Sequence, residues 1–228
     1  MKTRPLLFVF LLSLLFTGCA YSPIIADIPL ISRKNELRVD AGVSTALAAN
    51  ATVSYGLTDK IAVQTFANIG ADNMYYLHGA VGYYKDLGEN KIMEIYGGFG
   101  YGYGNAYSDV NPGFLAGNYQ TYFTQFNIGK VNGSFAHLDY GIGLKAGLLH
   151  SNMTDKNYYW RNDIIIVPFT TYKDNSLLFE PTCFIRFGGE RLKVNFKLGG
   201  LLMYKFTNTN LSFPYCPLDF GIGLNYLF

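Results

Sequence analysis

The residues best suited to carry chemistry in this chain are its three histidines, its three cysteines and its scattered charges. A metal site needs clustered Cys, His or carboxylate ligands, but His78, His137 and His150 are widely separated. We therefore expect no metal and no cofactor. His150 and Ser151 place a base beside a hydroxyl nucleophile, yet adjacent strand residues point to opposite faces. We accordingly predict no enzyme activity and assign no catalytic residue.

Spaced glycines between positions 97 and 104 invite comparison with a phosphate-binding loop. No helix is predicted after them, so the anion site that a helix N-terminus provides is missing. The glycines alternate with Phe99, Tyr101 and Tyr103, and this alternation indicates a strand with glycine on one face and aromatic rings on the other.

Composition excludes several classes of protein. The chain has 228 residues, of which 50% are hydrophobic, 17% aromatic and 15% charged. Charges are too sparse and aromatics too frequent for a disordered or nucleic-acid-binding chain, and three cysteines cannot build a disulfide-rich scaffold. A formal net charge of +2 points to no polyanionic partner, and we expect no nucleic acid. The composition does not indicate an oligomeric state.

The N-terminus has the features of a secretory signal peptide over residues 1–18. Two cations precede an apolar run that is too short to cross a bilayer as a helix. Gly18-Cys19 resembles a bacterial lipobox, and the resemblance implies cleavage before Cys19 and lipid on its sulfur. The alternative is an ordinary signal cut near Ala20. Residues 19–34 lack periodicity and are predicted to be a periplasmic tether. Cys183 and Cys216 fall on non-adjacent strands, so we predict free thiols at both.

Period-two alternation recurs along residues 35–228, which we predict to form one barrel domain. Between 135 and 149, for example, Leu138, Tyr140 and Ile142 alternate with Asp139 and Gly141. The ten expected strands cover residues 37–45, 51–57, 61–69, 75–84, 91–103, 119–130, 135–149, 177–187, 192–204 and 218–228. Pro181 is expected to mark a bulge in the eighth.

The apolar faces of these strands are flanked by aromatic residues, and the opposite faces are rich in glycine. A membrane barrel requires this pattern, because lipid surrounds its outer face and a polar lumen lies inside. A soluble barrel requires the reverse. Long connections at 104–118, 150–176 and 205–217 all follow odd strands, and short turns follow even ones. The sequence predicts an all-β, ten-stranded antiparallel transmembrane barrel with up-and-down topology, with eight or twelve strands as alternatives. Residues 162–172 are expected to form a hairpin above the membrane, and both barrel termini to be periplasmic.

The pattern resembles small bacterial outer-membrane β-barrel proteins of eight to ten strands made with a lipoprotein-type signal. The resemblance implies location in the outer membrane, a lipid anchor at Cys19, and contact with outer-membrane lipid and lipopolysaccharide. It also implies that the last strand is recognised by the barrel-assembly machinery. The residues carrying that assembly signal are Phe220, Ile222, Leu224, Tyr226 and Phe228.

Strand parity directs ten charged side chains into the lumen: Arg38, Asp40, Glu94, Asp139, Lys145, Glu180, Arg186, Lys193, Lys197 and Asp219. Because a buried charge needs a partner, five cations facing five anions predict cross-lumen pairs that plug the interior. The predicted function is therefore a structural role, or surface binding of a ligand or partner. A narrow solute channel is the alternative. An outer-leaflet lipid hydrolase comes third, because His150-Ser151 departs from the His-x-Ser pair of the lipid A deacylases that it resembles.

Overall fold

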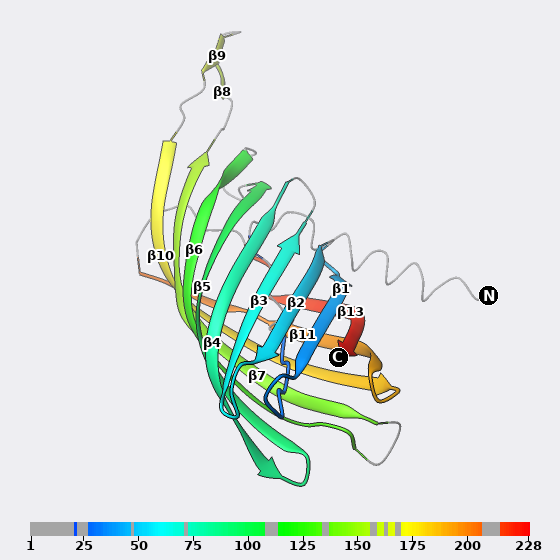
Figure 1. The fold of residues 1–228 in the computed structure, drawn as a ribbon. Coiled ribbons are helices and arrows are strands. Elements are labelled where there is room, and N and C mark those ends of the chain that lie inside the picture. Colours follow the sequence, from blue (N-terminus) through cyan, green and yellow to red (C-terminus); the bar gives the residue numbers. More distant parts are fainter. Residues whose placement is uncertain are drawn as a thin grey trace, which may run out of the picture.

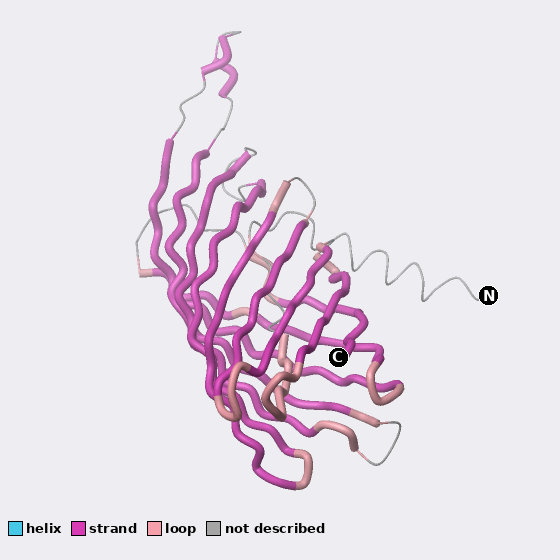
Figure 2. Tube along the Cα trace, in the orientation of Figure 1, coloured by secondary structure: helices cyan, strands magenta, loops and turns pink. Residues whose placement is uncertain are grey.

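The chain folds as an all-β protein whose strands lie side by side in one curved sheet (Figures 1 and 2). In this computed structural model the described residues are 21, 27–46, 48–70, 73–107, 114–133, 137–155, 159–161, 164–166, 170–206 and 215–228. The predicted signal peptide and Cys19 lie outside these residues.

Thirteen strands are present among the described residues. They are β1 Leu37–Ser44, β2 Ala49–Gly56, β3 Ile61–Ile69, β4 Tyr75–Gly88, β5 Lys91–Tyr107, β6 Phe114–Lys130, β7 Asp139–Asp155, β8 Tyr159–Arg161, β9 Ile164–Ile166, β10 Thr170–Gly188, β11 Leu192–Gly200, β12 Leu202–Lys205 and β13 Leu218–Leu227.

The main sheet is a closed, ten-stranded antiparallel barrel, as the alternation predicts. β1 to β7 pair in the order of the sequence, β7 pairs with β10, and β13 pairs with both β1 and β11, which closes the ring. β11 and β12 both pair with β10 and occupy one position in the ring, interrupted at Leu201. Closure gives β1 to β7, β10, β11 and β13 two hydrogen-bonded neighbours each, whereas β12 pairs with β10.

The two ends of the barrel differ. We call the end with the short links around 57–60, 89–90 and 189–191 the turn end, and the opposite end, which carries the links 108–113, 156–169 and 207–214, the loop end. Strand pairing puts Leu37 and Phe228 at the turn end, where the amide of Phe228 donates to the carbonyl of Leu37.

Alternation sorts the side chains of each strand between the two faces of the sheet. In β13, Phe220, Ile222 and Leu224 are exposed on the outside, whereas Asp219 and Asn225 are buried inside. The same rule leaves Val81 of β4 56% exposed. A band of exposed large apolar side chains surrounding a polar interior is the reverse of a soluble protein.

Several strands extend further towards the loop end than the sequence indicates. The predicted connection 150–176 is largely strand, because β7 continues to Asp155 and stays paired with β10 from Thr170. The pairs that continue the ladder include His150 with Asn175 and Asn152 with Lys173. These residues are polar, so a search for an apolar face misses them. β8 and β9 form a separate two-stranded sheet that stands away from the barrel (Figure 1). The hairpin expected at 162–172 agrees with the structure only for β9, because residues 170–172 belong to β10.

Pro181 does not produce the expected bulge against β7, because pairing from Thr170 to Arg186 continues without a shift. The irregularity occurs on its other side, where β11 ends at Gly200 and β12 begins at Leu202. Proline has no N–H to donate to a neighbouring strand. The interruption beside it is therefore explained by the missing donor.

The predicted tether does not match the described part of residues 19–34. Tyr21, Ile28, Leu30 and Ile31 are each at most 1% exposed, although they precede the first strand. They contact interior side chains of the barrel, such as Phe184 and Tyr119. An apolar segment is removed from water when it enters the barrel, which stabilises this placement.

Candidate functional site

The barrel interior holds all ten charged residues that strand parity directs inwards. Each is at most 6% exposed. Every one of the five cations lies within 3.6 Å of a carboxylate. Because an unpaired buried charge is costly, this pairing is what allows so many charges to share one narrow barrel.

We call the described residues before β1, which are 21 and 27–36, the N-terminal segment. Asp27 of this segment occupies the centre of the interior. Its carboxylate lies 3.2 Å from the Arg186 guanidinium and 3.0 Å from Nζ of Lys197. Its backbone carbonyl accepts hydrogen bonds of 3.0 Å from the side-chain amides of Gln64 and Gln125. These four partners come from β3, β6, β10 and β11, so Asp27 joins strands from different sides of the barrel.

Lys197 also lies 2.6 Å from Asp40 of β1. Asp40 accepts from the side-chain amides of Asn195 and Asn225, so its carboxylate is surrounded by donors on β11 and β13. The carbonyl of Ile28 accepts a 2.7 Å hydrogen bond from Arg186. The segment and the barrel wall therefore share one continuous polar network.

A second group of charges lies near the turn end. Asp139 pairs with Lys193 and lies 3.6 Å from Arg38, which itself is 2.6 Å from Glu36. Glu36 also accepts from the amide and hydroxyl of Ser32. This group links β1, β7 and β11 across the lumen to the residues just before β1.

Lys145 and Glu180 form a pair on adjacent strands, with 3.0 Å between Nζ and the carboxylate. Glu180 also accepts a hydrogen bond from the Tyr21 hydroxyl. Nζ of Lys145 lies 4.7 Å from the ring centre of Phe123, a distance at which a cation is attracted to the face of an aromatic ring.

Glu94 and Asp219 use neutral donors instead of cations. Glu94 accepts from the amide of Ile31 at 2.7 Å and from Asn127 at 2.9 Å. Asp219 accepts from the hydroxyl of Thr45 at 2.7 Å, at the loop end of β13. The prediction of charge balance is thus modified, because two of the five anions on the strands are satisfied without a cation.

The sequence prediction did not include Asp27 and Glu36, which supply carboxylates to three of the five cations, Arg38, Arg186 and Lys197. Asp27 falls in the predicted tether and Glu36 precedes the first predicted strand, so alternation gives neither side chain a direction. The apolar run Ile28-Pro29-Leu30-Ile31 beside Asp27 is the signal that could have found them, since a solvated tether has no reason to carry it.

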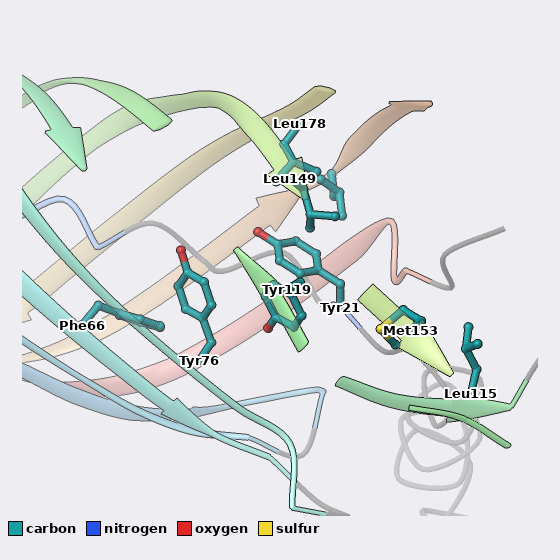
Figure 3. Packing of buried hydrophobic residues seen from close by; sticks show 9 residues of the cluster. Tyr21, Phe66, Tyr76, Leu115, Tyr119, Leu149, Met153 and Leu178 are labelled. Carbon is teal, nitrogen blue, oxygen red and sulfur yellow. The ribbon is translucent and has the colours of Figure 1, made fainter. Parts of the chain in front are cut away.

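An apolar and aromatic cluster fills the interior towards the loop end. It contains Tyr21, Phe66, Tyr76, Leu115, Tyr119, Leu149, Met153, Leu178 and Leu201 (Figure 3). Tyr21 packs edge-on against Tyr119 at 5.4 Å, and Tyr119 stacks on Tyr76 at 5.8 Å. Glycines make room for these rings: a Cβ on Gly100 would overlap the Tyr76 hydroxyl.

The histidines are dispersed, and His150 and Ser151 lie on opposite faces of β7. His150 is exposed and contacts Asn175 at 2.7 Å, whereas Ser151 is 1% exposed. His78 is buried and stacks on Phe66 at 5.0 Å. Across the described ranges, no group of three His, Cys, Asp or Glu residues is placed to hold a metal ion. The part of the chain that the structure describes contains no helix long and apolar enough to cross a membrane.

The two described cysteines differ from each other. Cys183 is free and exposed on the outer face. Cys216 is 1% exposed and disulfide-bonded, which contradicts the prediction that it is a free thiol. The prediction considered only a pair between Cys216 and Cys183, and Cys183 is not bonded.

No protein-family model matches the chain, and no curated protein matches it. Among solved structures, the chain is similar to the N-terminal β-barrel domain of Pseudomonas aeruginosa OprF. The identity is 15%, the similarity covers 86% of this chain and 98% of that chain, and the TM-score is 0.32.

Proposed function

We propose that this protein is an outer-membrane β-barrel whose lumen is closed by its own N-terminal segment, and that it acts in envelope structure or surface binding. The observation that carries the proposal is the position of Asp27. Its carboxylate and carbonyl together contact two cations and two amides from four strands in the centre of the barrel.

The outer surface supports insertion into a membrane. Exposed apolar side chains are found on almost every strand of the barrel, including Val43, Leu77, Ile142, Leu198 and Ile222. Exposed aromatic residues lie near both ends, for example Tyr75 and Tyr101 towards the loop end and Tyr83 and Phe187 towards the turn end. Outer-membrane barrels have such a band between two aromatic girdles.

The interior supports closure of the lumen. A conducting pore needs continuous water between its walls, but Ile28, Leu30 and Ile31 are buried where that path would run. The charged side chains beside them are engaged with one another rather than lining an open passage. Porins that pass solutes freely have 16 to 18 strands, and a ten-stranded barrel is much narrower.

The proposed orientation follows from the lengths of the links. The turn end faces the periplasm and the loop end faces outwards, as in other outer-membrane barrels. Outer-membrane lipid and lipopolysaccharide then surround the apolar band. We assign recognition by the barrel-assembly machinery to β13, whose outward face carries the alternating residues that end at Phe228.

We propose no catalytic role. The pair His150 and Ser151 lacks a shared face, so a hydroxyl nucleophile and its base do not meet. Mass spectrometry of lipid A from cells with and without the protein checks this point. A change in lipid A acylation that depends on His150 would replace the structural role with a hydrolase.

Single-channel conductance in a planar bilayer tests closure of the lumen. We expect the refolded chain, with its fold verified by heat-modifiable gel migration, to give no conductance steps. The matched comparison is a chain that begins at Arg33 and so lacks the residues that fill the lumen. We expect this shortened chain, with its fold verified in the same way, to conduct. Discrete steps from the unaltered chain that change in Glu94→Gln or Asp139→Asn would show that the charges line a channel instead.

A further inference from the structure

The residues before β1 contact the barrel at three different heights, and these heights follow the order of the sequence. At the turn end, the amide of Asn35 donates to the carbonyl of Gly56, and Gly56 donates to Glu36. Gly56 adjoins the short link between β2 and β3. The chain therefore enters the first strand from the turn end.

Further back along the chain, the contacts move up the interior. Ile31 donates to Glu94, near the start of β5, and Leu30 packs with Ile92 and Phe184. Asp27 then meets Arg186, Lys197, Gln64 and Gln125 around the middle of the barrel.

Tyr21 contacts residues of the loop end. Its carbonyl accepts a 2.9 Å hydrogen bond from the amide of Cys216, and it forms a parallel bridge with Tyr215. Both partners precede β13 and therefore lie at the end opposite to Phe228. The Tyr21 ring packs among Tyr119, Leu149 and Met153 (Figure 3).

The chain is long enough to connect these contacts through the lumen. From Tyr21 to Glu36 there are 36 minus 21, or 15, residue intervals. At about 3.3 Å per residue they span up to about 50 Å, compared with an apolar band about 25 Å tall. The passage thus needs no stretched backbone.

We propose that the N-terminal segment runs through the whole lumen and that the residues before Tyr21 leave the barrel at the loop end. This inference rests on the proposed function, in which the loop end faces outwards. The start of the mature chain then lies at the cell surface. A lipid on Cys19 then enters the outer leaflet, and not the inner leaflet that a periplasmic tether would reach.

Labelling of intact cells with a membrane-impermeant maleimide tests the proposal. The probe position is Ala20→Cys, in a Cys183→Ser background whose own labelling is subtracted. Two references mark the ends: Thr170→Cys for the loop end and Asp59→Cys for the turn end, both exposed positions. Only variants with heat-modifiable migration are compared, so that each signal comes from folded barrel.

We expect Ala20→Cys and Thr170→Cys to react on intact cells, and Asp59→Cys to react only after the outer membrane is permeabilised. Reaction of Ala20→Cys only together with Asp59→Cys would overturn the threading while leaving the orientation intact. No reaction of Ala20→Cys under either condition would also overturn it, because a residue that leaves the barrel is accessible. Reaction of Asp59→Cys alone on intact cells would overturn the proposed orientation. Passage of the segment through the lumen would then still be supported if Ala20→Cys reacted under the same conditions as Thr170→Cys, and overturned if it did not.

Discussion

The carboxylate of Asp27 lies 3.0 Å from the ammonium nitrogen of Lys197, and this contact ties the segment before the first strand to β11. Arg186 of β10 lies 3.2 Å from the same carboxylate oxygen. One residue outside the strands therefore neutralises two cations that point into the lumen.

We predict that Asp27→Asn lowers the free energy of unfolding by about 3–5 kcal/mol, the usual cost of removing one partner from a buried ion pair. Arg186 would lose its nearest carboxylate, while Lys197 would keep Asp40 at 2.6 Å. Urea unfolding in lipid vesicles, followed by the loss of heat-modifiable migration, measures the change.

Asp59→Asn is the matched control for this substitution. Asp59 lies exposed in the link between β2 and β3, where charge removal has little effect, within about 0.5 kcal/mol. Equal unfolding midpoints for the two variants would show that the Asp27 pairs contribute nothing to stability.

Strand parity gives the direction of the interior charges because a strand has only two faces and one of them is apolar. It therefore predicts the placement of Lys145, Glu180 and Asp219 without further information. It cannot predict the segment 27–36, because extended residues without alternation have no assigned face. The partners of Arg186 could be found only once a non-periodic segment was placed inside the barrel.

Parity also explains why the strand ends were too short in the prediction. An apolar face ends where the membrane ends, but hydrogen bonding between two strands does not. Pairing of β7 with β10 continues through polar residues as far as Asp155 and Thr170. The sequence thus predicts the part of each strand that carries an apolar face better than its full length.

The glycines of β5 are expected to differ in their tolerance of a side chain. A Cβ on Gly100 would lie 2.1 Å from the Tyr76 hydroxyl and 2.7 Å from the Thr121 hydroxyl, whereas a Cβ on Gly97 meets nothing within 4 Å. We predict that Gly100→Ala destabilises the barrel by about 1–3 kcal/mol through overpacking. Gly97→Ala on the outer face should leave the unfolding midpoint unchanged.

The same urea titration compares this pair of variants. Because the two positions lie on one strand, a general weakness of β5 would affect both equally. A similar loss in Gly97→Ala would therefore show that backbone conformation, and not the space around Tyr76, requires glycine here.

The outer face offers a test of membrane insertion itself. Val81 is exposed, so Val81→Arg in a water-soluble barrel would change stability by no more than about 0.5 kcal/mol. In a bilayer the same substitution places a cation against hydrocarbon, which costs about 2–4 kcal/mol near the midplane and less towards the interfaces.

Folding yield and urea stability of Val81→Arg in vesicles, compared with Asp59→Arg at the exposed turn end, separate these cases. We expect a clear loss for Val81→Arg alone. If both variants were as stable as the unaltered protein, the apolar band would not be facing lipid.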